Sequence, residues 1–302
     1  MDAEGLQKPA RQEEVGAAFA LGTRGADADF RLLMDLLDEL KTRLLIGDGA
    51  MGTRLLTAGA GLDQCLEEWC VTHADVVSRI HAEYIAAGAR LIRTNSFGAN
   101  AARLARFGCE RRVGELNWSA AQLARAAAKG KDVIVAGSVG PLGDAAPANC
   151  ASLFEDQIGA LLDGGAQCIV LETFQSLEEI FVAIEVKHSL HHCPVVCCLA
   201  CDDDGFLPDG STLTDAFAKL RAAGADVVGV NCTARPAAMP ALFAGLESHA
   251  PLAAFPSAGL RHTLPPAEFA RVAAALRDCG VRLVGGCCGT TPAHIAALGE
   301  HG

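Results

Sequence analysis

The sequence predicts an α/β fold, a (β/α)8 TIM barrel preceded by an N-terminal extension, and three observations lead to this prediction. Short apolar, β-branched runs alternate with Ala/Leu-rich amphipathic segments from residue 44 onward. Strict alternation indicates a parallel sheet whose strands are joined by helical crossovers. Eight such runs fall within the roughly 260 residues from 41 to 302, which is the size of this barrel. Polar and Gly-rich sequences follow most runs, at the strand ends where barrel active sites lie.

The first part of the chain, residues 1–40, is expected to form an extension with one helix, followed by the barrel over residues 41–302. Residues 1 to about 30 are polar and lack clear periodicity. Residues 29–41 instead carry leucines at helical spacing, namely Leu32, Leu33, Leu36, Leu37 and Leu40.

The predicted strands and helices of the barrel follow in order along the chain. The strands are expected at residues 44–47, 89–93, 133–136, 168–171, 194–199, 226–230, 252–255 and 281–284. Among the helices expected between them are residues 74–87, 101–106, 152–163, 177–188, 214–222 and 266–277. Short segments at 86–89, 163–166 and 222–225 place a glycine just before a predicted strand. Glycine there can end the preceding helix in the left-handed conformation.

The competing architecture is an open, doubly wound sheet. That fold would carry a G-x-G-x-x-G turn after its first strand, and residues 47–53 (Gly-Asp-Gly-Ala-Met-Gly-Thr) do not match it. The barrel is therefore the prediction.

Composition excludes several classes of protein. The net charge of −11 argues against nucleic acid as a partner, because phosphate binding needs a positive field. No apolar run approaches the ~20 residues that cross a bilayer, and the N-terminus lacks a secretory pattern. We therefore expect no membrane partner and a cytoplasmic location. Thirteen cysteines in a reducing compartment favour thiols used as metal ligands or as small core residues over a disulfide framework.

Three cysteines stand out from the thirteen. Cys287 and Cys288 are adjacent within a Gly-Gly-Cys-Cys-Gly-Thr sequence after the last predicted strand, and Cys232 follows the sixth. Three thiolates at strand ends could hold one zinc ion, Zn²⁺, and leave its fourth position open, which is typical of a catalytic site. The flanking glycines would let the backbone bend so that both neighbouring sulfurs turn toward one point. The alternative is that these are three small core residues.

The other cysteines are interpreted as core residues. Cys193, Cys197, Cys198 and Cys201 crowd around the fifth strand, but Cys197 and Cys201 share one face of it while Cys198 takes the other. Their spacing therefore does not converge on a tetrahedral site.

Two carboxylates and a group of neutral donors complete the candidate site. Asp48 and Glu172 end apolar runs, where a charge is costly unless a cation or hydrogen-bond donors reach it, and they suit the ammonium group of a substrate. The alternative is that each caps the helix that follows. Thr94-Asn95-Ser96-Phe97 and Asn231 offer amides and neutral donors that could hold a carboxylate.

These motifs resemble the homocysteine S-methyltransferase family. The resemblance rests on residues 48–53, 94–97, 229–232 and 285–292, and it spans about residues 41–298. The sequences of these motifs are most similar to those of the N-terminal homocysteine-binding module of cobalamin-dependent methionine synthase. The resemblance implies that Cys232, Cys287 and Cys288 bind zinc and that Asp48 and Glu172 hold the substrate ammonium. It also implies that the amides around Ser96 and Phe97 hold the substrate carboxylate, and that Asn231 orders the pocket beside the metal.

The expected function is zinc-dependent methyl transfer to the thiol of homocysteine, which gives methionine. A free alkyl thiol has a pKa of about 8.5 and is mostly protonated at neutral pH, whereas coordination to zinc deprotonates it. We expect no folate-binding or corrinoid-binding module in the same chain, since none is recognised up to Gly302. We therefore expect a methyl-corrinoid (methylcobalamin) on a separate protein as the donor. The alternatives are S-methylmethionine or S-adenosylmethionine as the donor, and a non-catalytic thiol-binding or zinc-binding partner protein.

Overall fold

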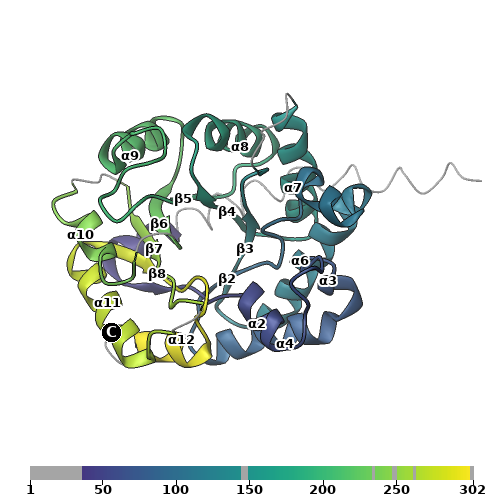
Figure 1. Ribbon diagram of the computed structural model, residues 1–302, viewed down its shortest axis with the longest axis horizontal. Helices are drawn as coiled ribbons and strands as arrows, with labels where there is room; N and C mark the ends of the chain where they lie inside the picture. Colours follow the sequence, from purple (N-terminus) through teal and green to yellow (C-terminus); the bar gives the residue numbers. More distant parts are fainter. Residues whose placement is uncertain (1–35, 144–148, 233–234, 247–249, 261–262, 300–302) are drawn as a thin grey trace, which may run out of the picture.

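The computed structural model describes residues 36–143, 149–232, 235–246, 250–260 and 263–299. Eight parallel strands form one sheet in the order β1-β8-β7-β6-β5-β4-β3-β2. A parallel bridge between Gly47 and Leu91 joins β1 to β2, so the sheet closes on itself. The strands form a ring with the helices outside it (Figure 1). The predicted (β/α)8 TIM barrel is therefore confirmed.

The strands lie where the apolar runs predict them. They are β1 (Leu45–Ile46), β2 (Leu91–Arg93), β3 (Ile134–Val139), β4 (Cys168–Phe174), β5 (Val195–Leu199), β6 (Val227–Asn231), β7 (Leu252–Phe255) and β8 (Val281–Val284). The end predicted for β3 and β4 is wrong by three residues, because both strands continue through polar residues that the sequence placed in loops. Ser138 and Glu172 are consequently strand residues.

From β1 onward the described residues contain eleven helices, and five of the six with predicted bounds begin and end within two residues of the prediction. They are α2 (Gly52–Thr57), α3 (Trp69–Thr72), α4 (Ala74–Ala86), α5 (Ala101–Leu104), α6 (Val113–Ala128), α7 (Cys150–Asp163), α8 (Leu177–Leu190), α9 (Leu213–Ala222), α10 (Met239–Phe243), α11 (Pro266–Asp278) and α12 (Pro292–Gly299). The helix predicted at 101–106 is divided into α5 and a 3-10 turn, η2 (Ala105–Phe107). A second such turn, η3 (Glu110–Arg112), leads into α6, which packs against β3.

The buried residues form two layers that alternate along each strand. The inner layer fills the barrel and consists of Leu45, Leu91, Ala136, Cys168, Val170, Val196, Cys198, Val227, Ala253, Phe255 and Leu283. Residues one position away, such as Ile92 and Cys197, belong to the outer layer between the sheet and the helices. This period of two fixes which strand residues reach the barrel axis.

The segment before β1 closes one end of the barrel. Residues 36–42 are helical, and the rest of the helix predicted at 29–41 lies outside the described residues. Leu36 and Leu40 are each 1% exposed and belong to the inner cluster of the barrel. Because this helix directly precedes β1, its leucines cover the end where the strands begin.

Two further observations concern the whole described chain. All thirteen cysteines lie within it, and none forms a disulfide bond. No helix in these residues has the length and apolar character that a membrane crossing requires.

Candidate functional site

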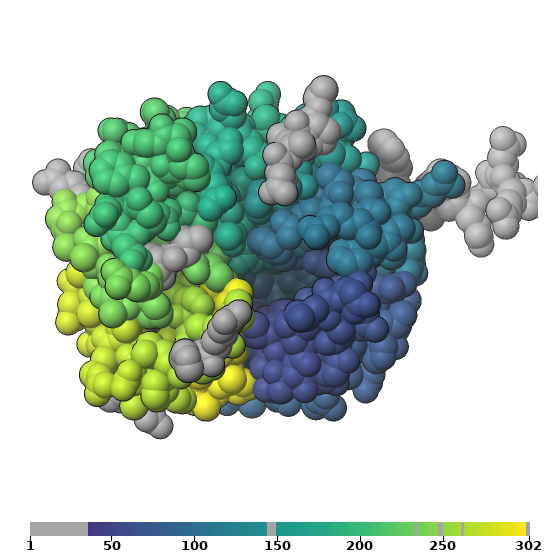
Figure 2. Space-filling model, in the orientation of Figure 1, coloured from purple at the N-terminus to yellow at the C-terminus, as the bar shows by residue number. Residues whose placement is uncertain are grey.

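A cavity of about 330 Å³ lies at the carboxyl end of the barrel. Seven of the eight residues predicted for the site line it: Asp48, Ser96, Phe97, Glu172, Cys232, Cys287 and Cys288. The eighth, Asn231, is fully buried and its side chain reaches Cys287. Figure 2 shows this face of the molecule hollowed near its centre. The strand ends therefore bring the predicted residues together from positions up to 240 residues apart, the span from Asp48 to Cys288.

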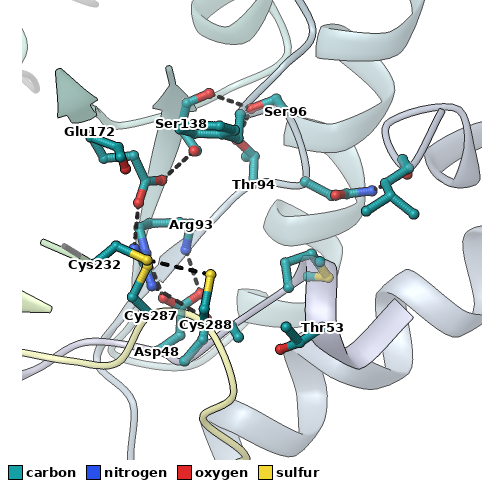
Figure 3. A pocket seen from close by; sticks show the side chains of 18 of the residues that line it. Asp48, Thr53, Arg93, Thr94, Ser96, Ser138, Glu172, Cys232, Cys287 and Cys288 are labelled. Carbon is teal, nitrogen blue, oxygen red and sulfur yellow. Dashed lines mark hydrogen bonds and ion pairs between the residues drawn. The ribbon is translucent and has the colours of Figure 1, made fainter. Parts of the chain in front are cut away.

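The three predicted metal ligands converge at one side of this cavity. Their sulfur atoms all lie within 4.8 Å of one another, and the Sγ atoms of Cys232 and Cys288 are 3.4 Å apart (Figure 3). Among the described residues, this is the one group of His, Cys, Asp or Glu side chains close enough to share a metal ion. Soft thiolate ligands favour zinc among the abundant divalent metals. The donor set thus fits a metal ion, and each thiol is half-buried next to the open cavity.

Close approach of the backbone explains the glycines around Cys287 and Cys288. A Cβ atom on Gly286 would lie 2.5 Å from the Oγ1 atom of Thr290, and one on Gly289 would lie 1.9 Å from the carbonyl oxygen of Gly259. Gly289 also has a φ of 79°, which side chains disfavour. The turn is fixed further because Cys287 N donates to the carbonyl oxygen of Pro256 at 2.9 Å. Glycine at these positions lets two neighbouring cysteines face one point.

The thiols affect one another's protonation. Hydrogen bonds with Cys232 and Cys287 lower the pKa of the Cys288 thiol, whereas hydrogen bonds with Cys232 and Cys288 raise the pKa of the Cys287 thiol. A thiolate at Cys288 is therefore stabilised by its two neighbouring thiols.

One of the three cysteines and one residue near them hold a left-handed backbone that only glycine adopts easily. Thr173 has a φ of 65° and Cys232 a φ of 68°, and no other non-glycine residue in the described chain has a positive φ. Asn231 braces the first of them: its Oδ1 atom accepts from Thr173 N at 2.7 Å, and its Nδ2 atom donates to Thr173 Oγ1 at 2.7 Å. Such conformations persist only where the surroundings hold them, and they cluster at functional sites.

The carboxylates Asp48 and Glu172 share a cation that sequence reasoning missed. Arg93, which is 6% exposed, donates from Nε to Asp48 Oδ1 at 2.8 Å and from Nη1 to Glu172 Oε2 at 2.7 Å. Its backbone N–H also donates to Asp48 Oδ2 at 2.7 Å, and Ser138 donates to Glu172 Oε1. In Figure 3 the guanidinium lies between the two carboxylates. Burial raises the pKa of Asp48 to about 6, although Arg93 opposes this shift.

A sequence signal for Arg93 does exist. Leu91 points into the barrel, so alternation along β2 places Arg93 on the same inward face two residues later. Two buried carboxylates at the same end of the barrel also require a cation nearby.

The segment at 94–97 is more constrained than the sequence suggested. Ser96 is fully buried, its hydroxyl lies 2.6 Å from Thr94 Oγ1, and its backbone N–H donates to the Thr94 carbonyl oxygen at 3.0 Å. No described residue accepts a hydrogen bond from Phe97 N. Of the two amides predicted to hold a carboxylate, that of Phe97 is therefore the one available to a ligand.

The remaining cysteines lie apart from this cluster. Cys198 belongs to the inner layer, while Cys197 and Cys201 belong to the outer one, as their positions predict. Burial raises the pKa of Cys201 to about 11 and that of Cys198 even further, so both are protonated thiols at neutral pH.

Comparison with known proteins agrees with this fold. The family model for homocysteine S-methyltransferase matches residues 45–301. The methionine synthase of Mycobacterium tuberculosis is 34% identical over 294 residues, which cover 86% of this chain and 25% of that protein. The homocysteine S-methyltransferase of Escherichia coli is 30% identical and is covered over 97% of its length. A crystal structure of the Escherichia coli homocysteine methyltransferase MmuM in its metallated form superposes with a TM-score of 0.75 at 31% identity, covering 89% of this chain and 99% of that one.

Fold and site together define a (β/α)8 barrel protein with a three-cysteine cluster that can hold a metal ion at the carboxyl end of its strands. The chain belongs to the homocysteine S-methyltransferase family. It spans about a quarter of the length of the mycobacterial methionine synthases that it matches.

Proposed function

We propose that the protein transfers a methyl group to the thiol of homocysteine and forms methionine, with zinc held by Cys232, Cys287 and Cys288. The observation that carries this proposal is the convergence of three thiols within 4.8 Å on the wall of a cavity that also contains two buried carboxylates. Family membership and the metallated relative support it.

Zinc bound there would supply a Lewis acid that keeps the substrate thiol deprotonated at neutral pH. Three cysteinates would carry a total charge of −3 against +2 on the metal, so the site would retain an excess of −1. A fourth sulfur held in such a site keeps much of its electron density and remains nucleophilic. No side chain is then needed as a general base.

The rest of the cavity would recognise the amino acid head of homocysteine. Asp48 and Glu172 together carry −2 when ionised, and Arg93 offsets only one of these charges. The excess negative charge favours an ammonium group at the edge of this carboxylate pair. The N–H of Phe97, which lines the same cavity, is available to the substrate carboxylate.

Methyl transfer itself is a displacement. A bond forms between the homocysteine sulfur and the methyl carbon while the bond from that carbon to the donor breaks, and the bonding electrons leave with the donor. The chain's contribution is to hold the sulfur and the amino acid head in one orientation so that the open side of the cavity is left for the donor.

We further propose a methyl-corrinoid carried by a separate protein as the donor. The similarity to methionine synthases supports this choice. Large apolar side chains are also exposed in the connections after β1, β2, β5 and β7, at the end of the barrel where the cavity lies: Leu62, Phe107, Phe206 and Leu260. Exposed apolar side chains in the connections at this end of the barrel suit a protein donor better than a small one.

The alternative is a small-molecule donor, S-methylmethionine or S-adenosylmethionine. The observation that favours it is the similarity to the Escherichia coli homocysteine S-methyltransferase, which this chain covers over 97% of its length.

The test is methionine formation by the zinc-loaded protein from homocysteine, with methylcobalamin, S-methylmethionine or S-adenosylmethionine as the donor in parallel reactions. Turnover with methylcobalamin supports the corrinoid donor, and turnover with either of the other two supports the alternative. If no donor gives methionine while homocysteine still binds, the protein is a thiol-binding partner and the proposal of catalysis is wrong.

A further inference from the structure

We propose that Arg93 is a positioning residue that fixes the metal-binding turn after β8 against the carboxylate pair Asp48–Glu172. This inference rests on the proposed metal binding by the three cysteines and deepens it, because it names the side chain that connects the metal ligands to the substrate-binding carboxylates.

The hydrogen bonds of Arg93 extend to three other strand ends. Besides the carboxylates after β1 and on β4, its Nη2 atom donates to the carbonyl oxygen of Gly286 at 2.6 Å and to that of Gly49 at 3.3 Å. Gly286 immediately precedes the ligand Cys287. The guanidinium therefore joins the residue before a metal ligand directly to both carboxylates.

The ring of Phe255 completes the surroundings of Arg93. Its centre lies 4.4 Å from the guanidinium carbon, and Phe255 is fully buried on β7. The same ring would contact a Cβ atom on Gly285 at 2.7 Å, so it also packs against the start of the turn. Arg93 is thus held between a carboxylate pair, an aromatic face and a carbonyl oxygen, and its planar guanidinium can satisfy all of these partners together.

A lysine cannot reproduce this arrangement. Its ammonium group keeps the positive charge but donates hydrogen bonds from one nitrogen atom, whereas the guanidinium offers five N–H donors in a fixed plane. Substitution R93K therefore separates the charge of Arg93 from its geometry. A matched control exists on the same segment, because Arg90 also pairs with two carboxylates, Glu39 and Asp132, and lies at the opposite end of the barrel.

The experiment compares wild type, R93K and R90K by zinc affinity in competition with a chromophoric chelator. A second measurement records the absorption spectrum of each protein loaded with cobalt(II), which reports the arrangement of the sulfur ligands. We expect R93K to bind zinc about tenfold or more weakly and to shift the cobalt bands, and R90K to stay within about twofold of wild type. The double variant R93Q/E172Q keeps the net charge of the triad while removing the guanidinium, and it is expected to behave as R93K does.

Two results would contradict the inference in different ways. Equal zinc affinity and equal cobalt spectra for wild type and R93K would overturn it while leaving the proposed function intact. Circular dichroism shows whether each variant folds. If R93K does not fold, zinc affinity and cobalt spectra of R93Q/E172Q equal to those of wild type would overturn the inference in the same way. Failure of the wild type itself to bind zinc would overturn the proposed function, and this inference with it.

Discussion

Asn231 and Thr173 are joined through both their side chains and the Thr173 backbone: the side-chain amide of Asn231 receives the Thr173 N–H and donates to its hydroxyl, each at 2.7 Å. This pair of hydrogen bonds holds Thr173 at a φ of 65°, and Asn231 Nδ2 also lies 3.9 Å from the sulfur of Cys287. A strained residue on the cavity wall and a proposed metal ligand therefore depend on one buried amide.

Substitution N231A is expected to lower the free energy of unfolding by about 2 kcal/mol, because two buried hydrogen bonds are lost and their partners remain. It should also weaken zinc binding, since Cys287 loses its neighbour. Urea denaturation and chelator competition measure the two effects. The matched control is N117A, which removes another fully buried asparagine that donates to two carbonyl oxygens, of Ala99 and Val113. If both variants lost zinc affinity equally, the loss would reflect general destabilisation.

The role of Glu172 in binding the ammonium group can be tested with two thiols. Substitution E172Q removes one negative charge, so homocysteine should bind about tenfold or more weakly to the zinc-loaded protein. The thiol 4-mercaptobutyrate has the same chain and carboxylate but no amino group, and its affinity should change by less than about threefold. Isothermal titration gives both affinities. An equal loss for both ligands would show that Glu172 acts on the pocket in general and would refute its assignment to the ammonium.

A buried histidine in α4 should make stability depend on pH. His81 is fully buried, neither ring nitrogen has a hydrogen-bond partner among the described residues, and burial lowers its pKa from 6.5 to about 4. As pH falls from 6.5 to 4, His81 binds a proton in the unfolded chain but stays neutral in the folded chain. The free energy of unfolding therefore decreases in this pH range. The full difference is on the order of 3 kcal/mol.

Substitution H81L should remove that loss, as measured by chemical denaturation between pH 7 and pH 4.5. The raised pKa of Asp48 acts with the opposite sign, because a carboxyl that stays protonated to about pH 6 in the folded state adds stability as pH falls. Comparing H81L with wild type isolates the histidine, and H192L at an exposed position is the control. Parallel pH curves for wild type and H81L would contradict the prediction.

The helix at 36–42 should contribute to stability without contributing to the site. Leu40 lies in the inner core at 1% exposure, so L40A is expected to lower the free energy of unfolding by about 3 kcal/mol. L37A, which truncates a half-buried leucine on the same helix, should cost less. Zinc affinity should be unchanged in both when measured well below their unfolding temperatures. A loss of zinc affinity in L40A would mean that the two ends of the barrel are coupled.

Much of this architecture could be predicted from hydrophobic periodicity and the order of the runs, because eight βα units leave few alternatives to a barrel. The residues at which the strands end were harder to predict. β3 and β4 continue through Ser138 and Glu172 because the barrel interior, rather than solvent, receives their side chains. A local pattern cannot distinguish a polar residue that points into a cavity from one that begins a loop.

The candidate site was predictable where residue type and spacing were unusual, as in Cys287-Cys288 with Cys232. Arg93 was missed because its role depends on contacts with Asp48, Glu172 and Gly286, which lie 45, 79 and 193 residues away in the chain. The brace between Asn231 and Thr173 was missed for the same reason, since the two lie on different strands. Alternation along β2 indicates that Arg93 points inward, but its partners follow only from the closed barrel.

The most direct test of the account is the zinc content of cysteine variants by elemental analysis. Wild type purified with zinc should hold one ion per chain, and C232A, C287A and C288A should each hold almost none. C198A, which truncates a fully buried cysteine of the inner layer, should keep the full complement. Full zinc content and undiminished homocysteine binding in C232A and C287A would contradict the account.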